Sequence, residues 1–105
     1  MKELDESLYD LLETIRKRPG FYIDEPSICR LRSFMVGYDC GVGRFGYHLK
    51  ANPDFHKFND WVARRLDYSS SKRGWCNMIR EKSPSDSDAF HLFFVLLEEF
   101  KKDAV

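Results

Sequence analysis

The side chains that could bind a metal or act as nucleophiles are scattered along this chain. The candidate zinc ligands are His48, His56, His91, Cys29, Cys40 and Cys76. No two of them have a close ligand spacing such as C-x-x-C or H-x-x-x-H. Nucleophilic catalysis needs a serine or cysteine, a histidine base and a third orienting group, and no motif marks such a triple. We therefore expect no catalytic residues, no metal and no cofactor, and do not expect an enzyme.

One short run matches a nucleotide-binding pattern. Residues 41–46 read Gly-Val-Gly-Arg-Phe-Gly, which spells G-x-G-x-x-G. That fingerprint binds a pyrophosphate only where a strand turns into a helix. Here the preceding residues follow a helical period, and Pro53 leaves little room for the helix that should follow. We interpret the run as helix packing or a distorted helix end.

Two basic doublets form the best candidate for binding nucleic acid. They lie at residues 64–65 and 72–73, close to Tyr68 and Trp75. Positive charge beside aromatic rings can bind phosphates and stack bases. Trp75 also fits the apolar face of a helix, and two aspartates lie among the bases. A small nucleic-acid-binding helical module is therefore our alternative hypothesis, and we expect nucleic acid to be the less favoured partner.

The element that must position these residues is the segment 27–49. Its large apolar residues alternate in steps of three and four, as on one face of a helix: Ile28, Leu31, Met35, Tyr38, Val42, Phe45 and Leu49. Ser27 can cap the first turn through its hydroxyl. A second row, Ser33, Gly37 and Gly41, has very little side-chain volume. Since glycine inside a helix costs about 1 kcal/mol, this row predicts that another backbone packs closely there.

The rest of the chain also reads as helical. An N-terminal helix from Leu4 ends at residues 19–20, a third follows Pro53, a short fourth is capped by Ser71, and a last one follows residues 85–88. In the connecting loop 21–26, we expect the first and third residues, Phe and Ile, to anchor on the core. The prediction is an all-α fold, a compact bundle of four to five helices with a long central helix, forming a single helical domain over residues 1–105.

Composition limits the partners and the compartment. Of 105 residues, 43% are hydrophobic and 15% aromatic, which excludes disorder, and the formal net charge is zero. The basic excess is confined to residues 16–82, between acidic ends. The N-terminus is charged and lacks an apolar leader, and no run approaches the roughly 20 apolar residues of a membrane span. We expect a cytoplasmic protein with reduced thiols and no membrane contact.

The aromatic and small-residue landmarks resemble those of immunity proteins from contact-dependent growth inhibition and related polymorphic toxin systems. The matching frame comprises residues 18–23 (Arg-Pro-Gly-Phe-Tyr-Ile), Ser27, Arg30, Leu31, Phe34, Gly37, Tyr38, Phe55, Phe58, Trp61, Val62, Trp75, Ala89, Phe90, Phe93, Phe94, Leu96, Leu97 and Phe100. Most of these positions read as core, so the frame describes a fold more than one partner.

The resemblance implies a bacterial protein that binds and neutralises a cognate toxin C-terminal domain by direct protein–protein contact. Tight inhibition usually depends on a few aromatic and charged anchors. The candidates expected to reach the surface lie in two loops: Tyr22, Asp24 and Glu25 in the first, and Asp67, Tyr68, Lys72 and Arg73 in the second. The toxin's activity and the oligomeric state stay open.

Overall fold

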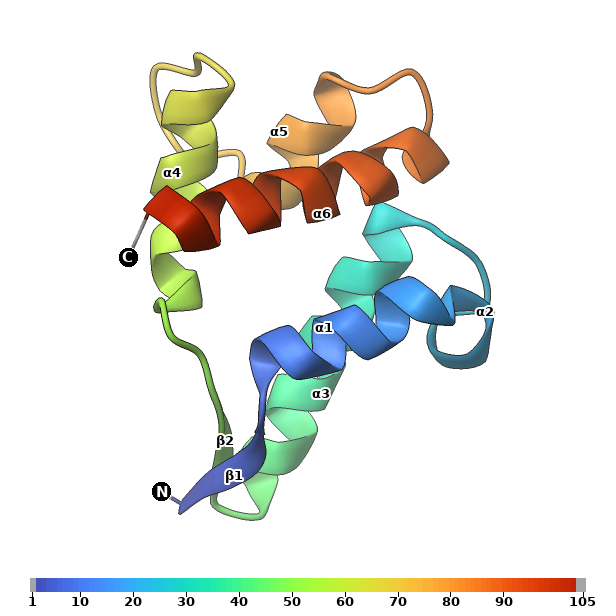
Figure 1. The fold of residues 1–105 in the computed structure, drawn as a ribbon, viewed down its shortest axis with the longest axis vertical. Coiled ribbons are helices and arrows are strands. Elements are labelled where there is room, and N and C mark those ends of the chain that lie inside the picture. The colour runs from blue at the N-terminus through green and yellow to red at the C-terminus, as the bar shows by residue number, and fades with distance from the viewer. Residues whose placement is uncertain (1, 104–105) are drawn as a thin grey trace.

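A computed structural model describes residues 2–103 (Figure 1). Its elements, in chain order, are β1 (Lys2–Ser7), α1 (Leu8–Lys17), α2 (Pro19–Tyr22), α3 (Ile28–Arg44), β2 (Tyr47–Lys50), the short 3-10 helix η1 (Phe55–Lys57), α4 (Phe58–Arg65), α5 (Trp75–Glu81) and α6 (Asp86–Asp103). The helix α6 packs against α3, α4 and α5, and α1 crosses α3 in the view of Figure 1. No helix among the described residues is long and apolar enough to cross a membrane.

The prediction of a mainly helical, compact protein is confirmed, but the strict all-α assignment is wrong. β1 and β2 form a two-stranded parallel sheet, in which Lys2 pairs with Tyr47 and Glu3 with His48. The predicted first helix is therefore too long at its N-terminus. Ser7 accepts a hydrogen bond from the backbone N–H of Asp10 (3.1 Å), which starts α1 at the following residue.

Serine caps set two further helix starts as the sequence predicts. The Ser27 hydroxyl accepts the N–H of Arg30 at 3.1 Å, and the Ser85 hydroxyl accepts the N–H of Asp88 at the same distance. The predicted Ser71 cap of the fourth helix is wrong. The side-chain oxygen of Asn59 instead accepts the N–H of Trp75 at 2.7 Å, across the contact between α4 and α5. No local sequence pattern reveals such a remote cap.

The core is built around aromatic rings from α4, α5 and α6. Phe58 is fully buried, and its ring centroid lies between 5.1 and 6.1 Å from those of Phe55, Trp61, Trp75, Phe93 and Phe100. Edge-to-face and offset geometries of this kind add to the free energy gained from burial. At the rim, the indole N–H of Trp61 donates to Asp103 at 2.9 Å, which ties α4 to the end of α6.

The central helix is long, as predicted, but its fully buried residues are confined to its first turn. Of the predicted apolar row only Ile28 and Leu31 are buried, and Phe45 is 80% exposed beyond the helix end. The close backbone approach predicted at Gly37 and Gly41 is also wrong, because a methyl group added at either glycine would meet nothing within 4 Å. The C-terminal half of α3 instead projects beside the small sheet (Figure 1).

The G-x-G-x-x-G run lies where this helix ends. Residues 41–44 are the last of α3, and Gly46 adopts a positive φ of 79° before β2. The order is helix to strand, the reverse of the dinucleotide-binding unit. The run is therefore a helix end, one of the two interpretations that the sequence left open.

Candidate partner-binding surface

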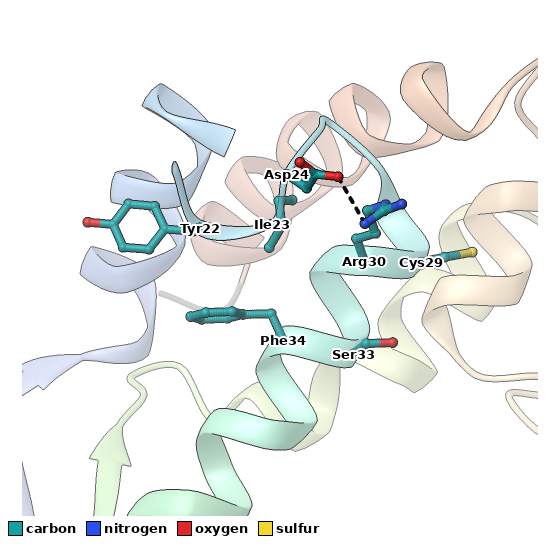
Figure 2. A pocket seen from close by; sticks show the side chains of 7 residues that line it. All are labelled: Tyr22, Ile23, Asp24, Cys29, Arg30, Ser33 and Phe34. Atoms are coloured by element: carbon teal, nitrogen blue, oxygen red, sulfur yellow. Dashed lines mark ion pairs between the residues drawn. The ribbon is translucent and has the colours of Figure 1, made fainter. Parts of the chain in front are cut away.

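Arg30 forms ion pairs with two acidic residues of the first loop. Asp24 adopts a positive φ of 75°, a conformation that aspartate tolerates better than bulkier residues do. The Arg30 guanidinium lies 3.4 Å from the Asp24 carboxylate and 3.3 Å from that of Glu25 (Figure 2). All three side chains are largely exposed. Their contribution to stability is therefore small, but together they present a mixed-charge feature to solvent.

Four aromatic rings lie beside this loop, and we call them the aromatic row: Phe21, Tyr22, Phe34 and Tyr38. Consecutive ring centroids are 5.0, 6.3 and 5.9 Å apart. Phe21 is 78% exposed, and the other three are half-buried. The prediction that Phe21 anchors the loop on the core is wrong; Ile23 is the residue that does so, with 6% exposure. Phe21 instead extends an aromatic surface into solvent.

A shallow pocket of about 550 Å³ opens between the loop and α3 (Figure 2). Its lining residues are Tyr22, Ile23, Asp24, Cys29, Arg30, Ser33 and Phe34. The pocket thus combines apolar rings with the Asp24–Arg30 ion pair. Aromatic rings and arginines are the side chains that dominate the binding energy of protein interfaces.

The second loop, between α4 and α5, by contrast makes its polar contacts within the chain. The Tyr68 hydroxyl lies 2.8 Å from the Glu81 carboxylate, and Arg73 lies 2.6 Å from the same residue. The ring of Tyr68 also lies 5.1 Å from the Lys82 ammonium. Desolvation, and after it the hydrogen bond to Glu81, raises the pKa of Tyr68 above its ordinary value. These contacts hold the loop against α5.

The two other candidates of this loop are exposed. Asp67 has a positive φ of 66° at the end of α4, and Lys72 follows Ser71, whose hydroxyl donates to Asp60 at 2.6 Å. The loop between α4 and α5 lies far from α2 in Figure 1. The structure therefore places the seven predicted residues in two separate clusters rather than in one site, and their roles in partner binding stay predictions.

Sequence reasoning missed three members of the first cluster. All three, Phe21, Phe34 and Arg30, belong to the matching frame, most of whose positions are expected in the core. Arg30 and Phe34 lie on α3, where Ile28 and Leu31 are the buried residues, whereas Phe21 lies on the short helix α2, which has no buried residue. A helical period identifies which residues share a face, but not how far along the helix that face stays covered.

A second pocket, of about 630 Å³, lies between β1, α3 and the segment from β2 to α5. It brings together Glu3 and His48, whose side chains are 3.5 Å apart, with Asp54 and His56 at 3.1 Å. The backbone N–H of His56 is the main cause that holds the pKa of Asp54 below its usual range. No group of three possible metal ligands occurs within residues 2–103. Because β1 was expected to be helical, this pairing could not be predicted.

Comparison with known proteins returns no matching family model, no matching curated protein and no matching solved structure.

Proposed function

We propose that this protein is a bacterial cytoplasmic immunity protein that binds and neutralises a cognate toxin domain through the aromatic row and its adjoining charged loop. The observation that carries the proposal is the exposure of this surface: Phe21 leaves 78% of its area in water beside three further rings. Large apolar groups gathered on a surface are typical of protein-binding sites. A toxin that covered them would gain the burial energy that the free protein leaves unused.

The charges beside the row give such an interface its specificity. Asp24 and Glu25 offer acceptor oxygens, and Arg30 still has exposed N–H groups. Charged groups on the rim of an apolar patch orient a partner and reject those of like charge. An inhibitor also needs no chemistry of its own, which agrees with our expectation that the chain has no catalytic residues and no cofactor.

The alternative, nucleic-acid binding, has weaker support. Arg65 of the first doublet lies 3.2 Å from Glu99, and Arg73 of the second pairs with Glu81. Each basic doublet is thus partly neutralised within the protein. Trp75, the aromatic residue expected to stack a base, packs against Phe93 in the core with centroids 4.9 Å apart.

The test begins with affinity purification of the tagged protein from the cells that encode it, in high salt, with mass spectrometry of what stays bound. We expect one stoichiometric toxin domain, whose activity is lost when the purified inhibitor is added back. Recovery of nucleic acid that dissociates steeply with salt would favour the alternative. A recovered protein whose activity the inhibitor does not change would refute the proposal.

Two phenylalanines provide a matched comparison. Phe21 and Phe45 are 78% and 80% exposed, so neither truncation to alanine should affect folding. Only Phe21 belongs to the aromatic row. Truncation of a residue central to binding typically costs about 2 kcal/mol or more, which is roughly a thirtyfold loss of toxin affinity. We expect that loss for Phe21→Ala and an unchanged affinity for Phe45→Ala.

A further inference from the structure

Two cysteines that are remote in the sequence meet where α3 contacts α5. Cys29 is in the first turn of α3, is partly exposed and lines the shallow pocket. Its sulfur points away from Tyr22 in Figure 2. Cys76, in the first turn of α5, is buried, and its thiol lies 3.9 Å from the carbonyl oxygen of Ile28, the residue before Cys29. The two cysteines are therefore neighbours across the contact between α3 and α5, one partly exposed and one buried.

An arginine completes the cluster. The Arg80 guanidinium donates to the sulfur of Cys29 at 3.1 Å. The same guanidinium also donates to the side-chain oxygen of Asn77 at 3.1 Å, and the Asn77 amide donates to the carbonyl of Arg73 at 2.9 Å. The cation is thus held in place by its own helix. A guanidinium against a thiol favours the thiolate, which is the nucleophilic form.

The buried thiol differs in character. Burial, together with the neighbouring Cys29, raises the pKa of Cys76 to about 11, so this thiol is protonated at neutral pH. Contact with the Cys29 sulfur also raises the pKa of Arg80. Cys40, the third cysteine, is exposed on α3 and has no hydrogen-bond partner among the described residues.

We propose that Cys29 is a peroxide-reactive thiol that forms a reversible disulfide with Cys76. In the first step the Cys29 thiolate attacks one oxygen of a hydroperoxide. A sulfur–oxygen bond forms, the oxygen–oxygen bond breaks, and the leaving oxygen takes a proton to give water or an alcohol. The sulfur is oxidised by two electrons to a sulfenic acid, and the peroxide is reduced.

In the second step the Cys76 sulfur attacks that of Cys29. The disulfide forms, the sulfur–oxygen bond breaks, and the hydroxide that leaves takes the proton of Cys76 and departs as water. A dithiol reductant restores both thiols. The linkage would join the first turns of α3 and α5 beneath the shallow pocket. This inference does not depend on the identity of any protein partner.

The test uses the full-length reduced protein and hydrogen peroxide as the probe. We expect each chain to lose two hydrogen atoms, peptide mapping to show a Cys29–Cys76 link, and dithiothreitol to reverse the change. In Cys76→Ser the sulfenic acid has no thiol to attack it, so dimedone should label Cys29. Since Cys76 is buried, circular dichroism must first show that this variant folds. Cys29→Ser, at a partly exposed position, must abolish the link in any case.

Replacement of Arg80 tests whether its positive charge promotes the first step. Arg80→Gln should slow the first step about tenfold, because the thiolate loses its stabilising cation. Lys82→Gln removes an equal charge two residues away, from an ammonium that lies over Tyr68 rather than near sulfur, and should leave the rate unchanged. The proposal is overturned if peroxide modifies Cys40 faster than Cys29, if no Cys29–Cys76 link forms, or if both charge variants react at the wild-type rate.

Discussion

Replacement of Phe58 by alanine should remove a large part of the stability of this protein. The side chain is fully buried and contacts five other aromatic rings from η1, α4, α5 and α6. Truncation of a buried phenylalanine typically costs about 3–5 kcal/mol, from lost burial and the cavity left behind. Because rings from four elements cannot all move inward without breaking their other contacts, we expect the upper half of that range.

Against a total of about 5–15 kcal/mol for a domain of this size, such a loss removes at least about a quarter of the stability. Urea denaturation followed by circular dichroism measures it. With a slope of about 2 kcal/mol per molar urea, the midpoint should fall by roughly 2 M. Phe45→Ala, which removes the same atoms from a ring that is 80% exposed, is the control and should not shift. A shift below about 0.5 M for Phe58→Ala, or equal shifts for both variants, would contradict this account of the core.

Three further outcomes follow from individual contacts. Asn59→Ala deprives the N–H of Trp75 of its acceptor at the start of α5, and should lower the unfolding free energy by about 1 kcal/mol. Ser71→Ala, at the cap predicted from the sequence, should lower the unfolding free energy by less. Trp61→Phe replaces the indole with a smaller phenyl ring and loses the hydrogen bond to Asp103. The lost hydrogen bond alone should cost about 1 kcal/mol, and Asp103→Asn should recover none of that loss in the double variant. The hydroxyl of Tyr9 donates to the carbonyl of Pro53, and burial raises the pKa of Tyr9 to about 12. The folded state holds this proton more tightly than the unfolded chain does, so the contribution of Tyr9 to stability should be complete below pH 10 and fall between pH 10 and 12. Urea midpoints measured across this range should decline less in Tyr9→Phe than in the wild type. An identical decline in both proteins would exclude the contribution.

Most of the helices could be predicted because their caps and apolar periodicity depend on residues that are close together in the sequence. Serine caps such as Ser27 act over three residues, and the apolar row of α6 is continuous, so both are visible in the sequence. The strand β1 is not predictable in this way, since it exists through pairing with residues about 45 positions away. Its leucine also fits the period of the following helix, which is why the first helix was predicted to start too early.

The surface could be predicted only in part. Tyr22, Asp24 and Glu25 are expected at the surface because they belong to a predicted loop. The structure places Tyr22 beside Phe34, and both acidic residues beside Arg30. The exposure of Phe21 could not be inferred, because an apolar residue next to a Pro-Gly stop is equally compatible with the core. Whether Tyr68 and Arg73 stay available depends on Glu81, a residue in the next helix whose position only the fold determines.

Hydrogen exchange on the complex with the recovered toxin is the most direct test of the proposed binding surface. Amide exchange is measured by mass spectrometry for the free and the bound protein, residue range by residue range. We predict slower exchange in the bound state for residues 20–38, which carry the aromatic row and Arg30, and unchanged exchange for residues 66–74, where the loop is already bonded to α5. Slower exchange confined to residues 66–74, with residues 20–38 unaffected, would contradict the assignment of the aromatic row as the inhibiting surface.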